Sequence, residues 1–216
     1  MKAAQIEKYD KNNIMVKMVE IEKPNIGDKD LLIRVVAAGV NPVDNMISRG
    51  EVRMIVPYKL PIVSGNEFVG IVEEIGKQVS KFNIGDRVFA RMPLNKIGAF
   101  TEYIAVEEEA LAKVPEYLTS IEAAAIPLTA LTIMQSLELM GAEKGKTIFI
   151  SGGTGSVGAM AIPIAKAKGL TVITNGSADS RDRVLDLGAE KFLDYMTEDY
   201  TKILKDVDYV LDTLRR

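Results

Sequence analysis

The chain has 216 residues, of which 47% are hydrophobic and 26% are charged, and its formal net charge is −3. These values are typical of a globular protein with one large or two small domains, and no basic block recommends nucleic acid or an anionic membrane as a partner. The chain contains neither Cys nor His. This absence excludes disulfides, thiol nucleophiles, Ser-His triads and zinc sites built on sulfur or nitrogen ligands.

The start of the chain and its hydropathy give no sign of export or membrane insertion. Charged residues stand at Lys2 and Glu7, too early for a signal peptide. No stretch reaches the roughly 18 apolar residues that a membrane span needs. We therefore expect a cytoplasmic protein with no membrane partner.

The first half of the chain contains short β-type runs separated by turn residues. The residues of Pro24-Asn-Ile-Gly-Asp28 and Asn83-Ile-Gly-Asp86 predict turns at these two segments. Several short strands at this spacing predict a barrel or sandwich. The expected strands are Lys2–Glu7, Met15–Glu20, Leu31–Ala38, Glu67–Ile75, Arg87–Ala90 and Thr101–Val106.

The pattern changes at Thr119-Ser-Ile-Glu122, which has the spelling of a capping box before an apolar run. We expect a helix to begin there, to be interrupted or restarted at Pro127, and to end near Gly141. The predicted domains are therefore an all-β domain at residues 1–120 and a second domain at residues 121–216.

Beyond Gly145, strand and helix patterns alternate. Starting with a strand at Thr147–Ile150 and a helix that contains Pro163, the pattern is βαβαβ with one further strand beyond it. This order predicts the first half of a doubly wound parallel sheet. The later expected elements are a strand at Thr171–Asn175, a helix at Ser180–Leu187, a strand at Lys191–Tyr195, a helix at Thr197–Lys205 and a strand at Val207–Thr213.

The glycine-rich stretch Ser151-Gly-Gly-Thr-Gly-Ser-Val-Gly158 lies between the first of these strands and its helix. That context is the one a dinucleotide fingerprint requires, although an ordinary tight βα turn is the alternative. The spacing assigns one glycine to the turn, one to close approach of a pyrophosphate and one to helix packing. The phosphates are expected at the helix N-terminus. The candidate cofactor-binding residues here are Gly153, Thr154, Gly155, Ser156, Val157 and Gly158.

Six segments in order resemble the medium-chain dehydrogenase/reductase superfamily, and within it the zinc-free NADPH:quinone oxidoreductase-like branch. The resemblance implies a GroES-like β-barrel domain followed by a partial Rossmann domain, with the active site in the cleft. The segments are Ala37–Asp44, Pro61–Gly70, Phe82–Val88, Gly98–Tyr103, Ala124–Ala130 and the glycine-rich stretch.

The sequence departs from the zinc-dependent members of that superfamily. Asn41 stands where those members carry a Cys, and Asn66 stands where they carry a His. Asp44 and Glu67 remain, but two carboxylates without nitrogen or sulfur ligands make a poor catalytic zinc site. We expect the two acids to hold loops on the barrel through hydrogen bonds, and we expect no zinc.

The tip of the second strand favours NADP over NAD. NAD sites place an acid at this tip, whereas the chain has Thr174-Asn-Gly-Ser177. Ser177 and Arg181 are candidates for binding the 2′-phosphate of NADPH. Asp179 lies close enough to serve as an NAD acid, which is the alternative. Tyr195 resembles the family tyrosine beside the adenine end.

Without metal, thiol or imidazole, direct hydride transfer from the cofactor to a quinone or an α,β-enone is the expected chemistry. By resemblance, Asn41 and Thr129 would lie near the nicotinamide and its ribose. Tyr58, in an expected loop at Asn45–Leu60, is a candidate proton donor, with packing as the alternative. Apolar residues that could line a pocket for a small apolar electrophile are Met46, Ile47, Met54, Ile55 and Val56.

The chain resembles a C-terminally truncated member of the family, because relatives continue with roughly two more strands. An edge at Val207–Thr213 would then be bare, which predicts a homodimer through that edge or poor solubility. Two functions therefore stay open: a quinone or enone oxidoreductase, and a catalytically silent dinucleotide-binding or structural remnant of one.

Overall fold

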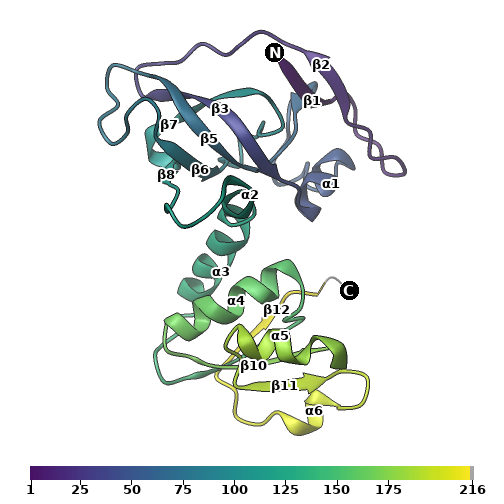
Figure 1. The fold of residues 1–216 in the computed structure, drawn as a ribbon. Coiled ribbons are helices and arrows are strands. Elements are labelled where there is room, and N and C mark those ends of the chain that lie inside the picture. Colours follow the sequence, from purple (N-terminus) through teal and green to yellow (C-terminus); the bar gives the residue numbers. More distant parts are fainter. Residues whose placement is uncertain (215–216) are drawn as a thin grey trace. The chain divides into compact units, whose positions relative to one another are not determined.

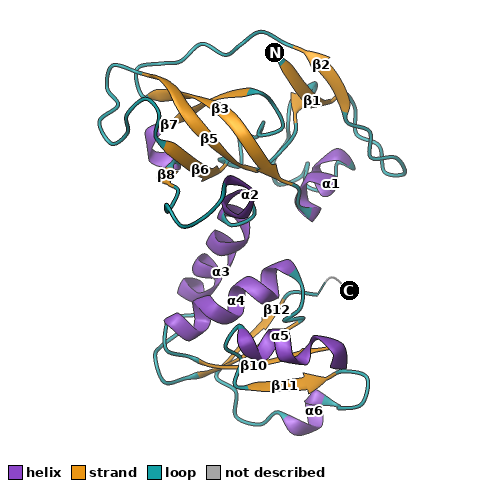
Figure 2. Cartoon of the chain, viewed as in Figure 1, coloured by secondary structure: helices purple, strands orange, loops and turns teal. Residues whose placement is uncertain are grey.

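The computed structural model describes residues 1–214, and the chain divides into two compact units. The first unit is Met1–Leu128, and the second begins at Thr129. The boundary predicted from the sequence, between residues 120 and 121, precedes this division by eight positions. The first unit is mainly strands and the second alternates strands and helices (Figures 1 and 2).

The first unit contains two antiparallel sheets. The five-stranded sheet has the order β7-β3-β5-β6-β8, and the three-stranded sheet has the order β2-β1-β4. A bridge between Ala3 and Thr101 adds a further antiparallel pairing in this unit. The strands are β1 (Lys2–Ile6), β2 (Lys17–Glu20), β3 (Asp30–Gly39), β4 (Ile62–Val63), β5 (Glu67–Ile75), β6 (Arg87–Arg91), β7 (Tyr103–Glu107) and β8 (Ala112–Lys113).

The long pairing of β3 with β5 organises the first unit. The two strands pair from Leu31 opposite Ile75 to Gly39 opposite Glu67, with two register shifts on the way. Leu31, Ile33 and Phe68 are fully buried and belong to one apolar cluster. Because side chains alternate between the faces of a strand, this pairing brings apolar residues from several strands into one core.

Two short helices and a 3₁₀ turn complete the first unit, and a longer helix begins at its last two residues. Helix α1 spans Pro42–Ser48, and a 3₁₀ turn, η1, spans Glu108–Ala110. Helix α2 (Ser120–Ala124) begins after Thr119, whose side chain accepts from the backbone N–H of Glu122 while the Glu122 carboxylate accepts from Thr119. The predicted capping box is therefore confirmed. Helix α3 (Pro127–Leu139) starts at Pro127 and ends before Gly141, as predicted.

The second unit is built on a parallel four-stranded sheet with the order β11-β10-β9-β12. In chain order this is 3-2-1-4, which confirms the prediction of half a doubly wound sheet. The strands are β9 (Thr147–Ser151), β10 (Thr171–Gly176), β11 (Lys191–Asp194) and β12 (Tyr209–Asp212). The helices are α4 (Ser156–Ala167), η2 (Ala178–Ser180), α5 (Arg181–Asp186) and α6 (Tyr200–Ile203).

The two faces of β9 pack against different helices. Ile148 and Ile150 share a buried cluster with Ile162 of α4 and Val184 of α5. Phe149, between them in the strand, instead stacks on Tyr200 of α6 with ring centroids 5.3 Å apart. This alternation follows from the strand period of two. A strand covered on both faces needs a continuous apolar run, and Thr147–Ile150 supplies most of one.

Several element bounds differ from the sequence prediction. Residues 45–48, expected in a loop, form the second half of α1, because Pro42 at the first turn and Asp44 near the helix start favour a helix there. The helix expected at Thr197–Lys205 is limited to α6, Tyr200–Ile203, capped by Asp199. Helix α4 continues through Pro163.

Within residues 1–214, β12 pairs only with β9, so its other edge has no described partner strand. Val210 on this strand is 56% exposed. The homodimer expected through this edge stays a prediction. None of the helices in the same residues combines the length and apolar composition that a bilayer span requires.

The capping box makes a testable contribution to stability. Replacing Thr119 by Ala removes the side-chain oxygen that accepts from the Glu122 N–H. We expect the free energy of unfolding to fall by about 0.5–2 kcal/mol in a denaturant titration. Thr119→Ser keeps the hydroxyl and should lose less than half of that amount. Equal losses in the two variants would contradict the capping role.

Candidate functional site

The glycine turn between β9 and α4 has its left-handed residue at Gly152, where φ is 77°. Gly153, the first glycine of the fingerprint spacing, does not have a positive φ. Gly155 is the N-cap of α4 in an extended conformation, with φ −71° and ψ 165°. The helix therefore begins immediately after the turn, and its first N–H groups have no intrahelical acceptors.

Two glycines of the fingerprint are required by the packing of the unit itself. A Cβ added at Gly153 would overlap the Oγ1 atom of Thr174 on β10, and one added at Gly158 would overlap the carbonyl oxygen of Gly152. Gly155 differs, because a Cβ there would meet only the Gly152 carbonyl oxygen at 3.5 Å, an ordinary contact. The described structure thus gives no packing reason for glycine at position 155.

Neighbouring strands hold the turn by hydrogen bonds. The Gly152 N–H donates to the side-chain oxygen Oδ1 of Asn175 at 2.8 Å, and the Gly153 N–H donates to the Asn175 carbonyl at 3.1 Å. The Thr213 hydroxyl donates to the Ser151 carbonyl at 2.7 Å, from the segment after β12. Sequence reasoning gave no role to Asn175 or Thr213, because neither belongs to the glycine motif.

A cavity of about 510 Å³ lies beside this turn, at the carboxyl ends of the parallel strands. Its volume is within the range of small-molecule sites, and this edge of an open α/β sheet is where ligands bind. Thr154 and Tyr195, two of the residues selected from the sequence, are in its lining. The other lining residues are Ser151, Gly152, Asn175, Gly176, Tyr200, Asp212 and Leu214.

The remaining candidates for cofactor binding surround this region with different exposures. Ser156, the first residue of α4, is exposed, whereas the side chain of Val157 packs on the apolar core. Ser177 directly follows the lining residue Gly176 and is half-buried. Arg181 begins α5, is exposed, and has its guanidinium carbon 5.8 Å from the centre of the Phe192 ring.

The first unit contains a separate buried polar network around Glu67, which is 1% exposed. One Glu67 oxygen accepts from the Asn41 side chain at 2.6 Å, and the other accepts from the Leu128 N–H at 2.7 Å. Asp44 accepts from the Asn41 N–H and from the Asn66 side chain, both at 2.7 Å. The two acids hold loops through hydrogen bonds, as expected from the sequence.

This network depends on Gly39 and on the start of α3. A Cβ at Gly39, opposite Glu67 in the sheet, would overlap the Glu67 carboxylate, so only glycine leaves room for it. Leu128 lies in the first turn of α3, where a carboxylate also interacts favourably with the helix dipole. Burial raises the pKa of the Glu67 carboxyl, and the nearby Asp44 raises it further. Burial likewise raises the pKa of Asp44.

The two other residues selected for catalysis lie in different units. Tyr58 belongs to the first unit, where its hydroxyl donates to the Leu94 carbonyl at 2.6 Å and burial raises the pKa of the phenol. Thr129 is buried near the start of α3 and is the first residue of the second unit. The catalytic roles of Tyr58 and Thr129 stay predictions.

The apolar residues considered for a substrate pocket divide by exposure. Ile47 is fully buried and packs with Ile6 and Ile97, so it belongs to the core. Met54 and Ile55 are 95% and 83% exposed. Within residues 1–214, no group of three or more His, Cys, Asp or Glu side chains is arranged to hold a metal ion.

The fold and the turn define a β domain joined to a dinucleotide-type α/β unit, and comparison with known proteins identifies the family. The Alcohol dehydrogenase GroES-like domain family matches residues 27–116. The chain is 33% identical over 221 residues to a chloroplastic quinone-oxidoreductase homologue of Spinacia oleracea, covering 98% of the chain and 67% of that relative. The chain belongs to the medium-chain dehydrogenase/reductase superfamily, among its quinone oxidoreductase-like members.

Solved structures agree with this assignment. The quinone oxidoreductase of Coxiella burnetii aligns with a TM-score of 0.87 and 32% identity, over 98% of this chain and 68% of that one. A mycobacterial protein solved in complex with NADPH aligns with a TM-score of 0.78 and 31% identity, over 94% and 61%. The chain spans 57–67% of the lengths of three curated relatives that it matches.

The raised pKa of Glu67 predicts a pH-dependent effect of Glu67→Gln. Because the folded-state pKa lies above the unfolded one, the stability contributed by the protonated acid is lost as pH rises through the folded pKa. Gln does not ionise, so the free energy of unfolding of the variant should rise relative to wild type from acid to neutral pH. Denaturant titrations at several pH values measure this difference.

Glu116 is exposed, and the variant Glu116→Gln is the matched control for this experiment. Its stability relative to wild type should change much less over the same pH range. If the difference in free energy of unfolding between Glu67→Gln and wild type stayed constant across that range, a raised pKa of Glu67 would be contradicted.

Proposed function

We propose that the chain carries the dinucleotide site of an NADPH-dependent oxidoreductase that passes a hydride directly to a quinone or an α,β-unsaturated carbonyl without a metal. The observation that carries this proposal is the cavity at the carboxyl ends of the strands, beside a glycine turn that opens into α4. A 12-residue helix presents free N–H groups and the positive end of its dipole to an anion there.

Packing requires glycine at only two of the three fingerprint positions, and this difference supports a ligand at the turn. Gly153 and Gly158 are needed by the protein's own packing, whereas Gly155 is exposed and has room for a Cβ. A glycine that packing does not require is expected where a ligand's phosphate must approach the backbone closely. The residues that would hold the cofactor are those selected from the sequence, from Gly153 to Gly158, with Ser177, Arg181 and Tyr195.

The charges at the end of β10 favour NADPH over NADH. The strand ends at Gly176 without an acid, and the first acid beyond it is the exposed Asp179 in η2. Arg181 forms no ion pair with an acidic side chain among the described residues. Its guanidinium is therefore available for the 2′-phosphate, with Ser177 as a second donor. A related mycobacterial protein has been solved with NADPH.

NADPH supplies the hydride when bound, and the protein's part is to orient the reactants and provide a proton. A quinone or enone suits this chain, because the chain has no Cys or His and such an acceptor carries its own electron sink. Asn41, which Glu67 holds in place, and Thr129 are proposed to contact the nicotinamide end. Tyr58 is the proposed proton donor, and its hydroxyl would leave the Leu94 carbonyl in order to donate to the substrate.

The proposal is tested by NADPH fluorescence titration and by NADPH oxidation in the presence of a simple quinone. We expect saturable NADPH binding and quinone-dependent oxidation above background. Arg181→Ala should weaken NADPH binding by about ten- to a hundredfold and change NADH binding by less than about threefold, since only NADPH carries the 2′-phosphate. Arg183→Ala, two residues along the same exposed helix, is the control and should affect neither.

Absence of NADPH binding would refute the proposed site. Binding without quinone-dependent oxidation would instead favour the alternative, a dinucleotide-binding module without oxidoreductase activity.

Two glycine variants distinguish a glycine needed for NADPH binding from a glycine needed for stability. Gly155→Val keeps backbone angles that L-residues adopt, and its Cβ meets only the Gly152 carbonyl oxygen at 3.5 Å, so loss of the favourable N-cap residue should cost no more than about 1 kcal/mol while NADPH affinity falls at least about tenfold. Gly158→Ala forces α4 away from the Gly152 carbonyl and should cost about 1–3 kcal/mol of stability. Unchanged NADPH affinity in a folded Gly155→Val variant would contradict phosphate binding at this turn.

A further inference from the structure

Asn175 is a buried polar side chain to which the dinucleotide fingerprint gives no role. It lies at the penultimate position of β10, is only 4% exposed, and lines the cavity beside the glycine turn. A buried amide is costly unless its polar atoms are hydrogen-bonded. Each of its polar atoms therefore needs an explanation.

The orientation of this amide is fixed by its partner. The Gly152 backbone N–H lies 2.8 Å from the Asn175 side chain, and a backbone N–H donates only to an acceptor, so the oxygen Oδ1 faces the turn. The opposite atom, the nitrogen Nδ2, carries two N–H donors. The Asn175 carbonyl also accepts from the Gly153 N–H, which locks the same residue to the turn a second time.

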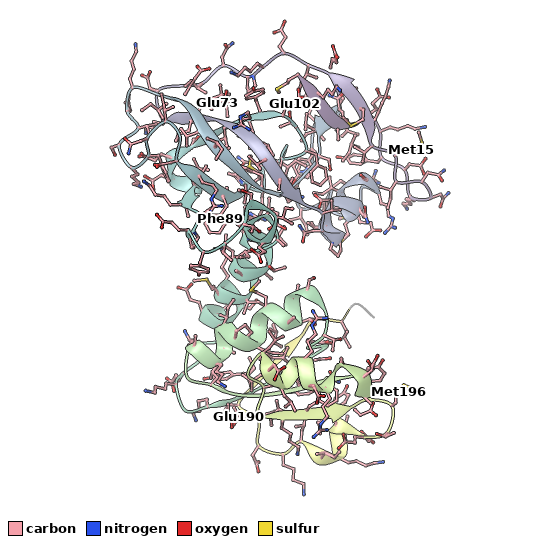
Figure 3. The ribbon with its side chains drawn as sticks, viewed as in Figure 1. Met15, Glu73, Phe89, Glu102, Glu190 and Met196 are labelled. Atoms are coloured by element: carbon pink, nitrogen blue, oxygen red, sulfur yellow. The ribbon has the colours of Figure 1, made fainter. Side chains whose placement is uncertain are left out.

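The Nδ2 group is the part of Asn175 that is left for a ligand. No hydrogen bond within residues 1–214 uses it as a donor. Its residue lines the cavity together with Thr154 and Tyr195, on the side where the strands end. Tyr195 is followed by the exposed Met196, which Figure 3 labels at the end of β11. Nδ2 is not among the solvent-inaccessible side-chain atoms without a partner in the described residues, so it is open to the cavity, where it can donate to an acceptor oxygen of a ligand.

We propose that the Nδ2 group of Asn175 donates a hydrogen bond to a phosphate oxygen of the bound dinucleotide. A phosphate oxygen fits best because the amide is tied to the start of the turn that leads to the N-terminus of α4, where anions are favoured. Asn175 thus holds the glycine turn with its oxygen and contacts the ligand with its nitrogen. This inference rests on the proposed dinucleotide site.

Asn175→Asp is the informative variant, because Asp has nearly the same shape and keeps an acceptor for the Gly152 N–H. It replaces the donor by a carboxylate oxygen, which repels phosphate. A carboxylate at this buried position is expected to lower the unfolding midpoint, so NADPH affinity is measured at a temperature well below the midpoint of the variant. NADPH affinity should fall at least about tenfold by fluorescence titration. Gln135→Glu adds the same charge on an exposed part of α3 and should leave NADPH affinity unchanged.

A second measurement needs no variant. In wild-type protein labelled with ¹⁵N, the two side-chain N–H resonances of Asn175 should shift on addition of NADPH. Shifted resonances together with weak binding by Asn175→Asp support the inference. Unmoved resonances overturn it whatever the affinity of the variant, and so does binding by a folded Asn175→Asp within twofold of wild type. In either case NADPH binding by wild type would leave the proposed function intact, whereas no binding by wild type would overturn both.

Discussion

The close approach of α4 to the turn after β9 is the constraint on which the second unit depends. The Gly152 carbonyl lies where any side chain at Gly158 would have to go, and Gly152 itself needs a left-handed backbone. Asn175 on one neighbouring strand and Thr213 after the other hold the turn in place. The order 3-2-1-4 therefore has a functional consequence, because it puts β10 and β12 on the two sides of β9. The same turn frees the first N–H groups of α4 for an anion.

The first unit buries two carboxylates, Glu67 and Asp44, in a network of hydrogen bonds. Glu67 and Asp44 receive four hydrogen bonds, from two Asn side chains and two backbone N–H groups. Each Asn stands where zinc-dependent relatives were expected to carry a metal ligand, and each donates to an acid instead. The buried acids keep raised pKa values, because these donors only partly replace lost water. The network fixes Asn41 and the backbone N–H of Leu128 at the start of α3.

The sequence predicted most of the fold, because its local signals agree with the tertiary structure. Thr119 and Glu122 stand at capping-box spacing, and Pro127 and Gly141 mark the limits of α3. The short α1 was missed, since seven residues carry too little periodicity to separate a helix from a loop. Thr154 and Tyr195 were selected from motif position and lie in the cavity lining, whereas Asn175 was passed over. Its importance comes from β10 lying beside β9, a contact between residues 23 positions apart that no local pattern records.

A crystal structure of the chain with NADPH would show directly whether the glycine turn and its cavity form the dinucleotide site. We expect the pyrophosphate against the backbone at Gly155 and the start of α4, within hydrogen-bond distance of the Asn175 amide nitrogen. Density for the dinucleotide at any other position, with the cavity beside Gly152 holding only water, would contradict it.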